Sequence, residues 1–173
     1  MLTYDFTFIV GADPHDDAFE DCFIEAGCDD ATFILRRGAV ALSFDREDVD
    51  YKHAVLSAYQ NIREAGADII RFEPDFLVSA PEIAERAQIS RAAVDNYVKG
   101  QRRVGFPLPD ARFSAKSPLW DWVEVSKWLW ENEMLGENEY RHALISRVIN
   151  LGVQINHLDP SLAFDIEKKL IAA

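Results

Sequence analysis

The sequence is poor in cysteine, in basic residues relative to acidic ones, and in long apolar runs. Its two cysteines, Cys22 and Cys28, are too few for a disulfide framework or a four-ligand zinc site, so we expect free thiols in a reducing, cytoplasmic environment. No apolar run approaches the roughly 20 residues that span a bilayer, and residues 1–5 lack the basic start of a signal peptide. We therefore expect no membrane segment.

Recognisable catalytic motifs are absent as well. The sequence contains no glycine-rich phosphate loop and no HExxH metalloprotease motif. The acidic runs 15–17 and 28–30 have the composition of turns and helix caps, and we expect that role for them. The four histidines stand without a partner at a recognisable catalytic spacing: His15, His53, His142 and His157. We expect no enzyme, no metal site and no cofactor.

Acidic residues outnumber basic ones by 30 to 18, which gives a formal net charge of −12. This balance alone argues against a nucleic-acid ligand, because binding to phosphates requires positive potential. The distribution of charge matters more than its sum. Residues 86–116 hold seven basic and two acidic residues, a net charge of +5, so the rest of the chain carries −17. One basic island in an acidic chain indicates two surfaces with different partners.

The 173 residues, 49% of them hydrophobic, suit one ordinary domain or two small ones. Over residues 1–75 the hydrophobic period switches repeatedly between two residues and 3.6 residues. The predicted strands are 5–10, 32–36, 39–44 and 68–73, and the predicted helices are 16–27 and 50–65. This β-α-β-β-α-β order predicts a ferredoxin-like domain, whose antiparallel sheet has two helices on one face and an open second face.

Helical patterns dominate from residue 77 onward and are interrupted once, at 100–118, where glycine and proline are frequent. Beyond the interruption we predict a tryptophan-rich helix at 122–132, a long helix at 138–154 and a last short helix from Pro160 to about Leu170. The sequence thus predicts an α+β chain of three segments. Their bounds are 1–75, 76–132 and 133–173.

Residues 78–100 have the pattern of two short helices joined by a tight turn. Pro81 favours a helix start, Ser90 is a good N-cap for the second helix, and Gly100 ends it. The inward positions expected for the two helices and the turn are Ile83, Ala84, Ala87, Ile89, Val94, Tyr97 and Val98. This spacing resembles the helix-turn-helix of DNA-binding regulators, in particular the MerR-like and excisionase-like winged group, over about residues 76–131. Gln88 departs from the pattern, because such motifs often have glycine there, and we expect a slightly reshaped turn.

The resemblance implies that the second helix is a recognition helix that enters the major groove. Its outward face and N-cap present Ser90, Arg91, Ala92, Asp95, Asn96 and Lys99. The resemblance also implies a wing, a hairpin with its tip at 111–116 flanked by residues 106–109 and 117–120. The wing and its approach would contact the DNA backbone through Gln101, Arg102, Arg103, Arg112 and Lys116.

The tryptophans are candidates for base stacking, but core packing explains them better. Val125, Trp128 and Leu129 have the spacing of one buried helix face. Trp120 stands where it would hold the wing against the helices. We therefore expect core packing for the whole set: Trp120, Trp122, Trp128 and Trp130.

The resemblance, together with the basic island, implies a bacterial-type transcriptional regulator that binds double-stranded DNA at a specific operator. A homodimer is expected, since one short helix reads too few base pairs to be specific. The dimer would form through the helices of 133–173, through the open sheet of 1–75, or through both. The acidic domain at 1–75 would sense a small ligand or dock a protein.

Two alternatives stay open from the sequence. In the first, the chain is an antitoxin-like or anti-defence protein whose acidic N-terminal domain neutralises a basic protein partner while the helix-turn-helix autoregulates its operon. In the second, the chain is a protein-interaction module whose helix-turn-helix has lost DNA binding. Gln88 and Asp95 leave room for this second alternative.

Overall fold

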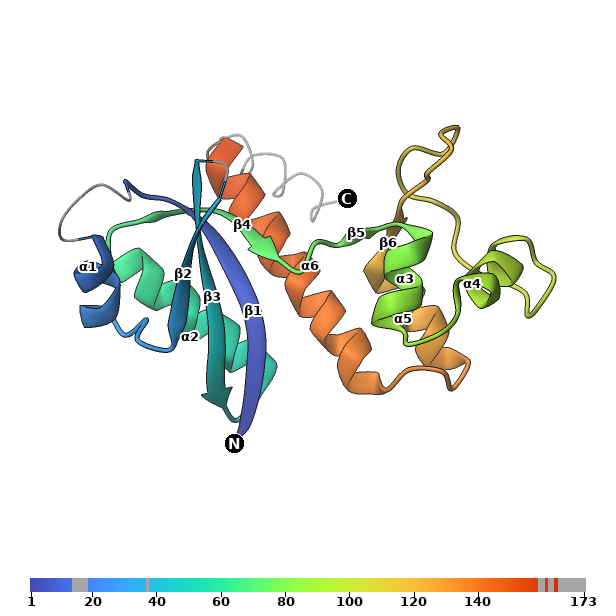
Figure 1. Cartoon of the computed structure of the whole chain (residues 1–173), viewed down its shortest axis with the longest axis horizontal. Helices are drawn as coiled ribbons and strands as arrows, with labels where there is room; N and C mark the ends of the chain where they lie inside the picture. The colour runs from blue at the N-terminus through green and yellow to red at the C-terminus, as the bar shows by residue number, and fades with distance from the viewer. Residues whose placement is uncertain (14–18, 37, 159–160, 162–163, 165–173) are drawn as a thin grey trace. The chain divides into compact units, whose positions relative to one another are not determined.

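The computed structural model describes residues 1–13, 19–36, 38–158, 161 and 164, and shows a mixed α+β chain (Figure 1). The chain forms two compact units: unit 1 comprises residues 1–74 and 148–173, and unit 2 comprises residues 75–147. Within the described residues, no helix has the length and apolarity needed to cross a membrane. The acidic run 15–17 and most of the helix predicted from Pro160 lie outside the described residues.

Unit 1 contains a four-stranded sheet in the order β2-β3-β1-β4, with every neighbouring pair antiparallel. Its elements follow one another in the order that the sequence predicted. They are β1 (Leu2–Gly11), α1 (Phe19–Glu25), β2 (Ala31–Arg36), β3 (Ala39–Asp48), α2 (Tyr51–Glu64) and β4 (Asp68–Glu73). The two central strands are longer than predicted: β1 at both ends, and β3 at its C-terminal end, where the alternation of buried and exposed residues continues to Asp48.

Inward and outward side chains alternate along β1 and β3, and the inward ones give the sheet one apolar face. Phe6 and Phe8 of β1 lie opposite Phe44 and Leu42 of β3, and all four side chains are buried. Phe72 of β4 joins them, with its ring centroid 4.8 Å from that of Phe8. Helix α2 covers this face with a stripe of small and branched side chains: Ala54, Val55, Ala58 and Ile62.

The outer edge of β4 is protected by a side chain from helix α6 (Glu137–Leu158). The Asn150 amide nitrogen donates to the backbone carbonyl of Phe72 at 2.8 Å, and its amide oxygen accepts from the Phe72 N–H at 3.1 Å. Asn150 is fully buried. One side-chain amide therefore takes the place of a neighbouring strand at this position, which blocks edge-to-edge pairing there.

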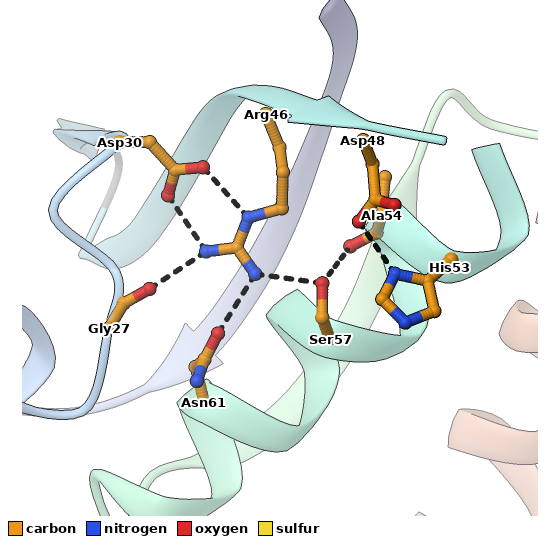
Figure 2. A network of polar contacts seen from close by, with 8 residues as sticks. All are labelled: Gly27, Asp30, Arg46, Asp48, His53, Ala54, Ser57 and Asn61. Carbon is orange, nitrogen blue, oxygen red and sulfur yellow. Dashed lines mark hydrogen bonds and ion pairs between the residues drawn. The ribbon is translucent and has the colours of Figure 1, made fainter. Parts of the chain in front are cut away.

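A buried arginine joins three segments of unit 1 (Figure 2). The Arg46 guanidinium donates to both carboxylate oxygens of Asp30, at 2.7 and 2.8 Å, and to the Gly27 carbonyl at 2.8 Å. It also donates to Ser57 Oγ at 3.1 Å and Asn61 Oδ1 at 2.8 Å. These bonds use all five guanidinium N–H groups, which is what permits the charge to be buried between β3, α2 and the loop before β2.

The same region adds contacts that the sequence did not predict. Asp30 lies in a turn, as expected, and also holds the Arg46 guanidinium in a bidentate pair. His53, for which the sequence offered no catalytic partner, has its Nδ1 2.7 Å from Asp48 Oδ2. This hydrogen bond raises the pKa of His53 and lowers that of Asp48. The nearby Cys28 thiol is buried, and desolvation raises its pKa to about 11.

Unit 2 consists of short helices around an aromatic core. Its elements are β5 (Leu77–Val78), α3 (Ala80–Arg86), α4 (Arg91–Val98), β6 (Trp120–Asp121), α5 (Trp122–Glu131) and the first part of α6. The antiparallel pair β5–β6 was not predicted, because two-residue strands show no alternation. It joins the residues just before α3 to the residues just before α5.

We predict that Arg46→Met lowers the free energy of unfolding by about 3 kcal/mol, because it leaves the Asp30 carboxylate and Asn61 without their cation. Urea unfolding followed by far-UV circular dichroism measures the change. All four tryptophans lie in unit 2, so their fluorescence follows that unit separately. The control is Arg63→Met, which breaks an exposed pair with Asp68 and should cost less than about 1 kcal/mol. Equal effects of the two substitutions would contradict a structural role for the Arg46 network.

Candidate nucleic-acid interface

Helices α3 and α4 are joined by a four-residue turn, 87–90. The first helix starts with a capping box, in which the Glu82 carboxylate accepts from the Ser79 N–H at 2.7 Å and from its hydroxyl at 2.6 Å. The Ile89 N–H donates to the Ala84 carbonyl at 2.9 Å, which closes the turn. Ile89 packs against the core of unit 2, as the sequence predicted.

Gln88 itself adopts the left-handed conformation, with φ of 53°. The backbone therefore takes the shape that glycine would favour, and the expected reshaping is not needed to form the turn. Non-glycine residues enter this region at a cost of about 1 kcal/mol. The Gln88 side chain is exposed.

Helix α4 separates an inward face from a solvent face. Its N-cap is confirmed, because Ser90 Oγ accepts from the Ala93 N–H at 3.2 Å. Val94 and Tyr97 are buried in the core, whereas Val98, expected to point inward, is 44% exposed. The prediction for Val98 was wrong because Tyr97, one residue earlier, already fills the inward position with a larger ring.

The predicted contact residues of α4 lie on or beside the solvent face. Arg91, Ala92 and Asp95 are exposed, Asn96 is half-buried, and Lys99 is the exposed C-cap. Asn96 has a second task, since its backbone carbonyl accepts from the N–H groups of two residues that follow the helix: Gln101 at 2.9 Å and Arg102 at 3.3 Å. The backbone of Gln101 and Arg102 is thereby tied to the end of α4, while both side chains are exposed.

Aromatic packing holds the segment after α4 on the core. Phe106 lies with its ring centroid 5.1 Å from Trp128, 6.2 Å from Tyr97 and 6.4 Å from Trp120. The indole N–H of Trp128 donates to the Val104 carbonyl at 3.2 Å, and that of Trp120 to the Pro107 carbonyl at 3.1 Å. We call these rings and their two indole hydrogen bonds the aromatic clasp.

The clasp confirms core packing for most of the tryptophans. Trp120, Trp122 and Trp128 are buried. Trp130 is the exception, because it is partly exposed and stacks face to face on Tyr140 with centroids 5.4 Å apart. It lies on the outer side of α5, where the 3.6-residue period places it away from the core.

The predicted wing is an open loop rather than an extended hairpin. A single bridge closes it, in which Ala111 and Leu119 exchange backbone hydrogen bonds of 3.1 and 2.9 Å. Within the loop, the Ala115 N–H donates to the Arg112 carbonyl at 2.9 Å. Arg112 has φ of 54°, and both it and Lys116 are exposed. The loop extends beyond β6 as a free tip (Figure 1).

Two arginines of the basic island have partners within unit 2. Arg86 is half-buried, lies 5.5 Å above the Trp122 ring, and has a pKa that burial lowers. Arg103 donates to the backbone carbonyl and the side-chain oxygen of Asn132, at 2.8 and 2.9 Å. Asn132 is the C-cap of α5, so the Arg103 charge sits at a helix C-terminus that favours cations. Sequence patterns gave no sign of either pairing.

The open face of unit 1 forms a second, shallower candidate site. A hollow of about 640 Å³ lies between side chains of all four strands, among them Ile9, Ile34, Arg36, Ala41 and Arg71. Its lining mixes apolar side chains with two guanidinium groups, and Arg71 pairs with Glu73 at 2.6 Å. In the described residues, no group of three or more histidine, cysteine, aspartate or glutamate side chains is arranged to hold a metal ion.

Comparisons with known proteins give no support in either direction: no protein-family model, no curated protein and no solved structure matches this chain. Any functional assignment therefore depends on the residues and their geometry.

We predict that Gln88→Gly raises the free energy of unfolding of unit 2 by up to about 1 kcal/mol, because glycine adopts positive φ without steric cost. Urea unfolding followed by tryptophan fluorescence measures it. Gln101→Gly is the matched control, since Gln101 is also exposed but lacks positive φ, and the added chain entropy should destabilise it slightly. A loss of stability in both variants would show that Gln88 is not strained.

Proposed function

We propose that this chain is a sequence-specific, double-stranded DNA-binding transcriptional regulator of bacterial type. In this proposal residues 76–132 act as a winged helix-turn-helix. The protein acts in the cytoplasm, whose reducing environment keeps thiols such as Cys22 and Cys28 free. Helix α4 enters the major groove, and the loops at 100–105 and 111–119 contact the backbone beside it. One observation carries the proposal: in a chain of net charge −12, α4 and the two loops after it carry six exposed basic side chains and only two exposed acidic ones.

The contacts follow from side-chain chemistry. Arg91 stands at the first position of α4, from which its guanidinium can fork onto a guanine edge or clamp a phosphate. Asn96 suits an adenine edge, and Asp95 suits a cytosine amino group. Ala92 is small enough to allow close approach. The sequence-independent part of the affinity comes from the phosphate contacts of Ser90, Lys99, Gln101, Arg102, Arg103, Arg112 and Lys116.

For unit 1 we infer a ferredoxin-like domain. The order β2-β3-β1-β4 and the β-α-β-β-α-β sequence of elements support this assignment. Its open face, with the hollow of about 640 Å³, offers a place for a small ligand that regulates DNA binding.

The acidic surface of unit 1 supports a second candidate function, in which an antitoxin-like or anti-defence protein binds a basic protein partner. Asp5 and Asp45 lie directly opposite each other on β1 and β3, and Glu47 lies beside them opposite Thr3. Like charges at opposed positions destabilise a sheet, so they suggest a role in binding rather than in folding. This function is compatible with DNA binding by unit 2 as autoregulation.

Helix α6 supports the proposal of a homodimer. Its exposed apolar side chains follow a 4-3-4 spacing, are between 41% and 58% exposed, and are Leu144, Val148, Leu151 and Ile155. This spacing places leucine at the d positions and β-branched residues at the a positions, which favours a parallel two-stranded coiled coil. Residues 140–158 contain no acidic residue, so a dimer through this stretch brings no carboxylates together although the whole chain is acidic.

We predict salt-dependent binding of the full chain to DNA fragments selected from a genomic library. If five to seven basic side chains touch phosphates, the logarithm of affinity should fall against the logarithm of salt concentration with a slope on the order of −5. Arg91→Ala with Lys99→Ala should reduce this slope by about 2 and weaken sequence preference, as measured by fluorescence anisotropy.

The control double variant is Lys52→Ala with Arg63→Ala, which removes the same charge from α2 of unit 1. It should leave the affinity and the slope unchanged. The DNA-binding proposal fails if selection enriches no site and binding shows no salt dependence. That outcome would favour a protein-interaction module.

We predict that Leu151→Glu converts the full chain from a dimer to a monomer, because it places a carboxylate in the apolar stripe of α6. Light scattering after size-exclusion chromatography measures the mass. Asn138→Asp adds the same charge to an exposed position in the first turn of α6 and should leave the dimer intact. A monomeric wild type, or a Leu151→Glu variant that stays dimeric, would refute the α6 interface.

A further inference from the structure

Phe113 is the most exposed phenylalanine of the chain, at 71%. Most phenylalanines here fill the two cores, and folding strongly favours their burial. Phe113 belongs to unit 2, where Phe106 is held by the aromatic clasp, yet Phe113 is not part of that core. A large aromatic side chain kept in solvent at the tip of a loop is a candidate for direct contact with a partner.

The backbone of the loop presents this ring outward. The Ala111–Leu119 bridge closes the base of the loop, and the 2.9 Å hydrogen bond from the Ala115 N–H to the Arg112 carbonyl closes a turn at its tip. Phe113 and Ser114 are the two central residues of that turn. The left-handed conformation of Arg112 sets the direction in which the chain enters it. Side chains at the centre of such a turn point away from the closing hydrogen bond.

The charged residues around Phe113 indicate what kind of partner its ring contacts. Arg112 precedes Phe113 directly and Lys116 follows three residues later, and both side chains are exposed. Residues 111–120 contain no acid, although the whole chain carries 30. DNA has stacked bases, which an apolar ring can contact from a groove, and phosphates on both sides, which cations can bind. An apolar ring between two cations therefore suits a DNA groove.

We propose that Phe113 is an apolar wedge that inserts between two base pairs from the minor groove and bends the DNA, while Arg112 and Lys116 bind the flanking phosphates. This inference rests on the DNA-binding function proposed above and adds a residue that its contact set did not contain. Insertion requires partial unstacking of one base step, which flexible pyrimidine–purine steps allow most easily. A TA or CA/TG step is therefore expected in the binding site about half a helical turn from the bases that α4 reads.

The test uses the full-length chain and the DNA site enriched by selection, with Phe113→Ala as the variant. Förster transfer between dyes at the two DNA ends measures bending, and 2-aminopurine at the expected step reports unstacking. Phe113→Ala should abolish the bend and the fluorescence increase and should weaken binding about tenfold, within the range for loss of one stacked aromatic. It should keep the wild-type salt slope, because no charge is removed. Phe113→Trp should retain the bend.

Leu108→Ala is the matched control, because Leu108 is 80% exposed in the same segment but stands between two prolines rather than between cations. It should leave bending and affinity unchanged. The wedge is refuted if Phe113→Ala binds and bends DNA like wild type, or if both variants lose affinity equally. It is also refuted if Phe113→Ala instead abolishes binding to vesicles of anionic phospholipid. If the wild type shows no salt-dependent DNA binding, the proposed function itself fails together with the wedge.

Discussion

The candidate interface depends on the aromatic clasp. The segment after α4 is rich in glycine and proline and forms no regular secondary structure, so its own backbone cannot hold it in place. Phe106 lies against Tyr97 of α4 and Trp128 of α5, and the indole N–H groups of Trp120 and Trp128 satisfy carbonyls of the segment. These contacts fix where the exposed basic residues on both sides of the clasp stand relative to the solvent face of α4.

The basic residues of unit 2 differ in whether their charge is used within the fold or faces solvent. Arg86 lies over Trp122, and Arg103 caps α5 through Asn132, so both also stabilise the fold of unit 2. The cations of α4 and of the two loops face solvent, within a chain whose remaining charge is strongly negative. A polyanion is attracted to this strip and repelled elsewhere, which restricts the orientation in which it can bind. The negative charge of the rest of the chain therefore helps to orient a polyanion on the basic residues of α4 and the two loops.

In unit 1, sequence patterns predict the secondary structure but not the contacts between distant residues. The strands β1 and β3 were predicted from their hydrophobic period, and the alternation of buried and exposed residues in β3 continues to Arg46, which points into the core. The signal for a buried arginine was thus present, but its partners were not predictable. Gly27, Asp30 and Asn61 come from other elements, and only the folded sheet brings them within hydrogen-bond distance of the guanidinium. The same holds for Asn150, which meets Phe72 from 78 residues away.

For the candidate site, the sequence by itself determined the local features: the caps at Ser79 and Ser90, the two short helices, and the concentration of positive charge after Arg86. These depend on residues within one or two turns of each other, where spacing and side-chain chemistry decide the outcome. The tertiary structure alone decided that Val98 is exposed and that Phe113 stands free at a loop tip. Whether a side chain is buried depends on which residues from distant parts of the sequence pack around it. Those neighbours are known only once the chain is folded.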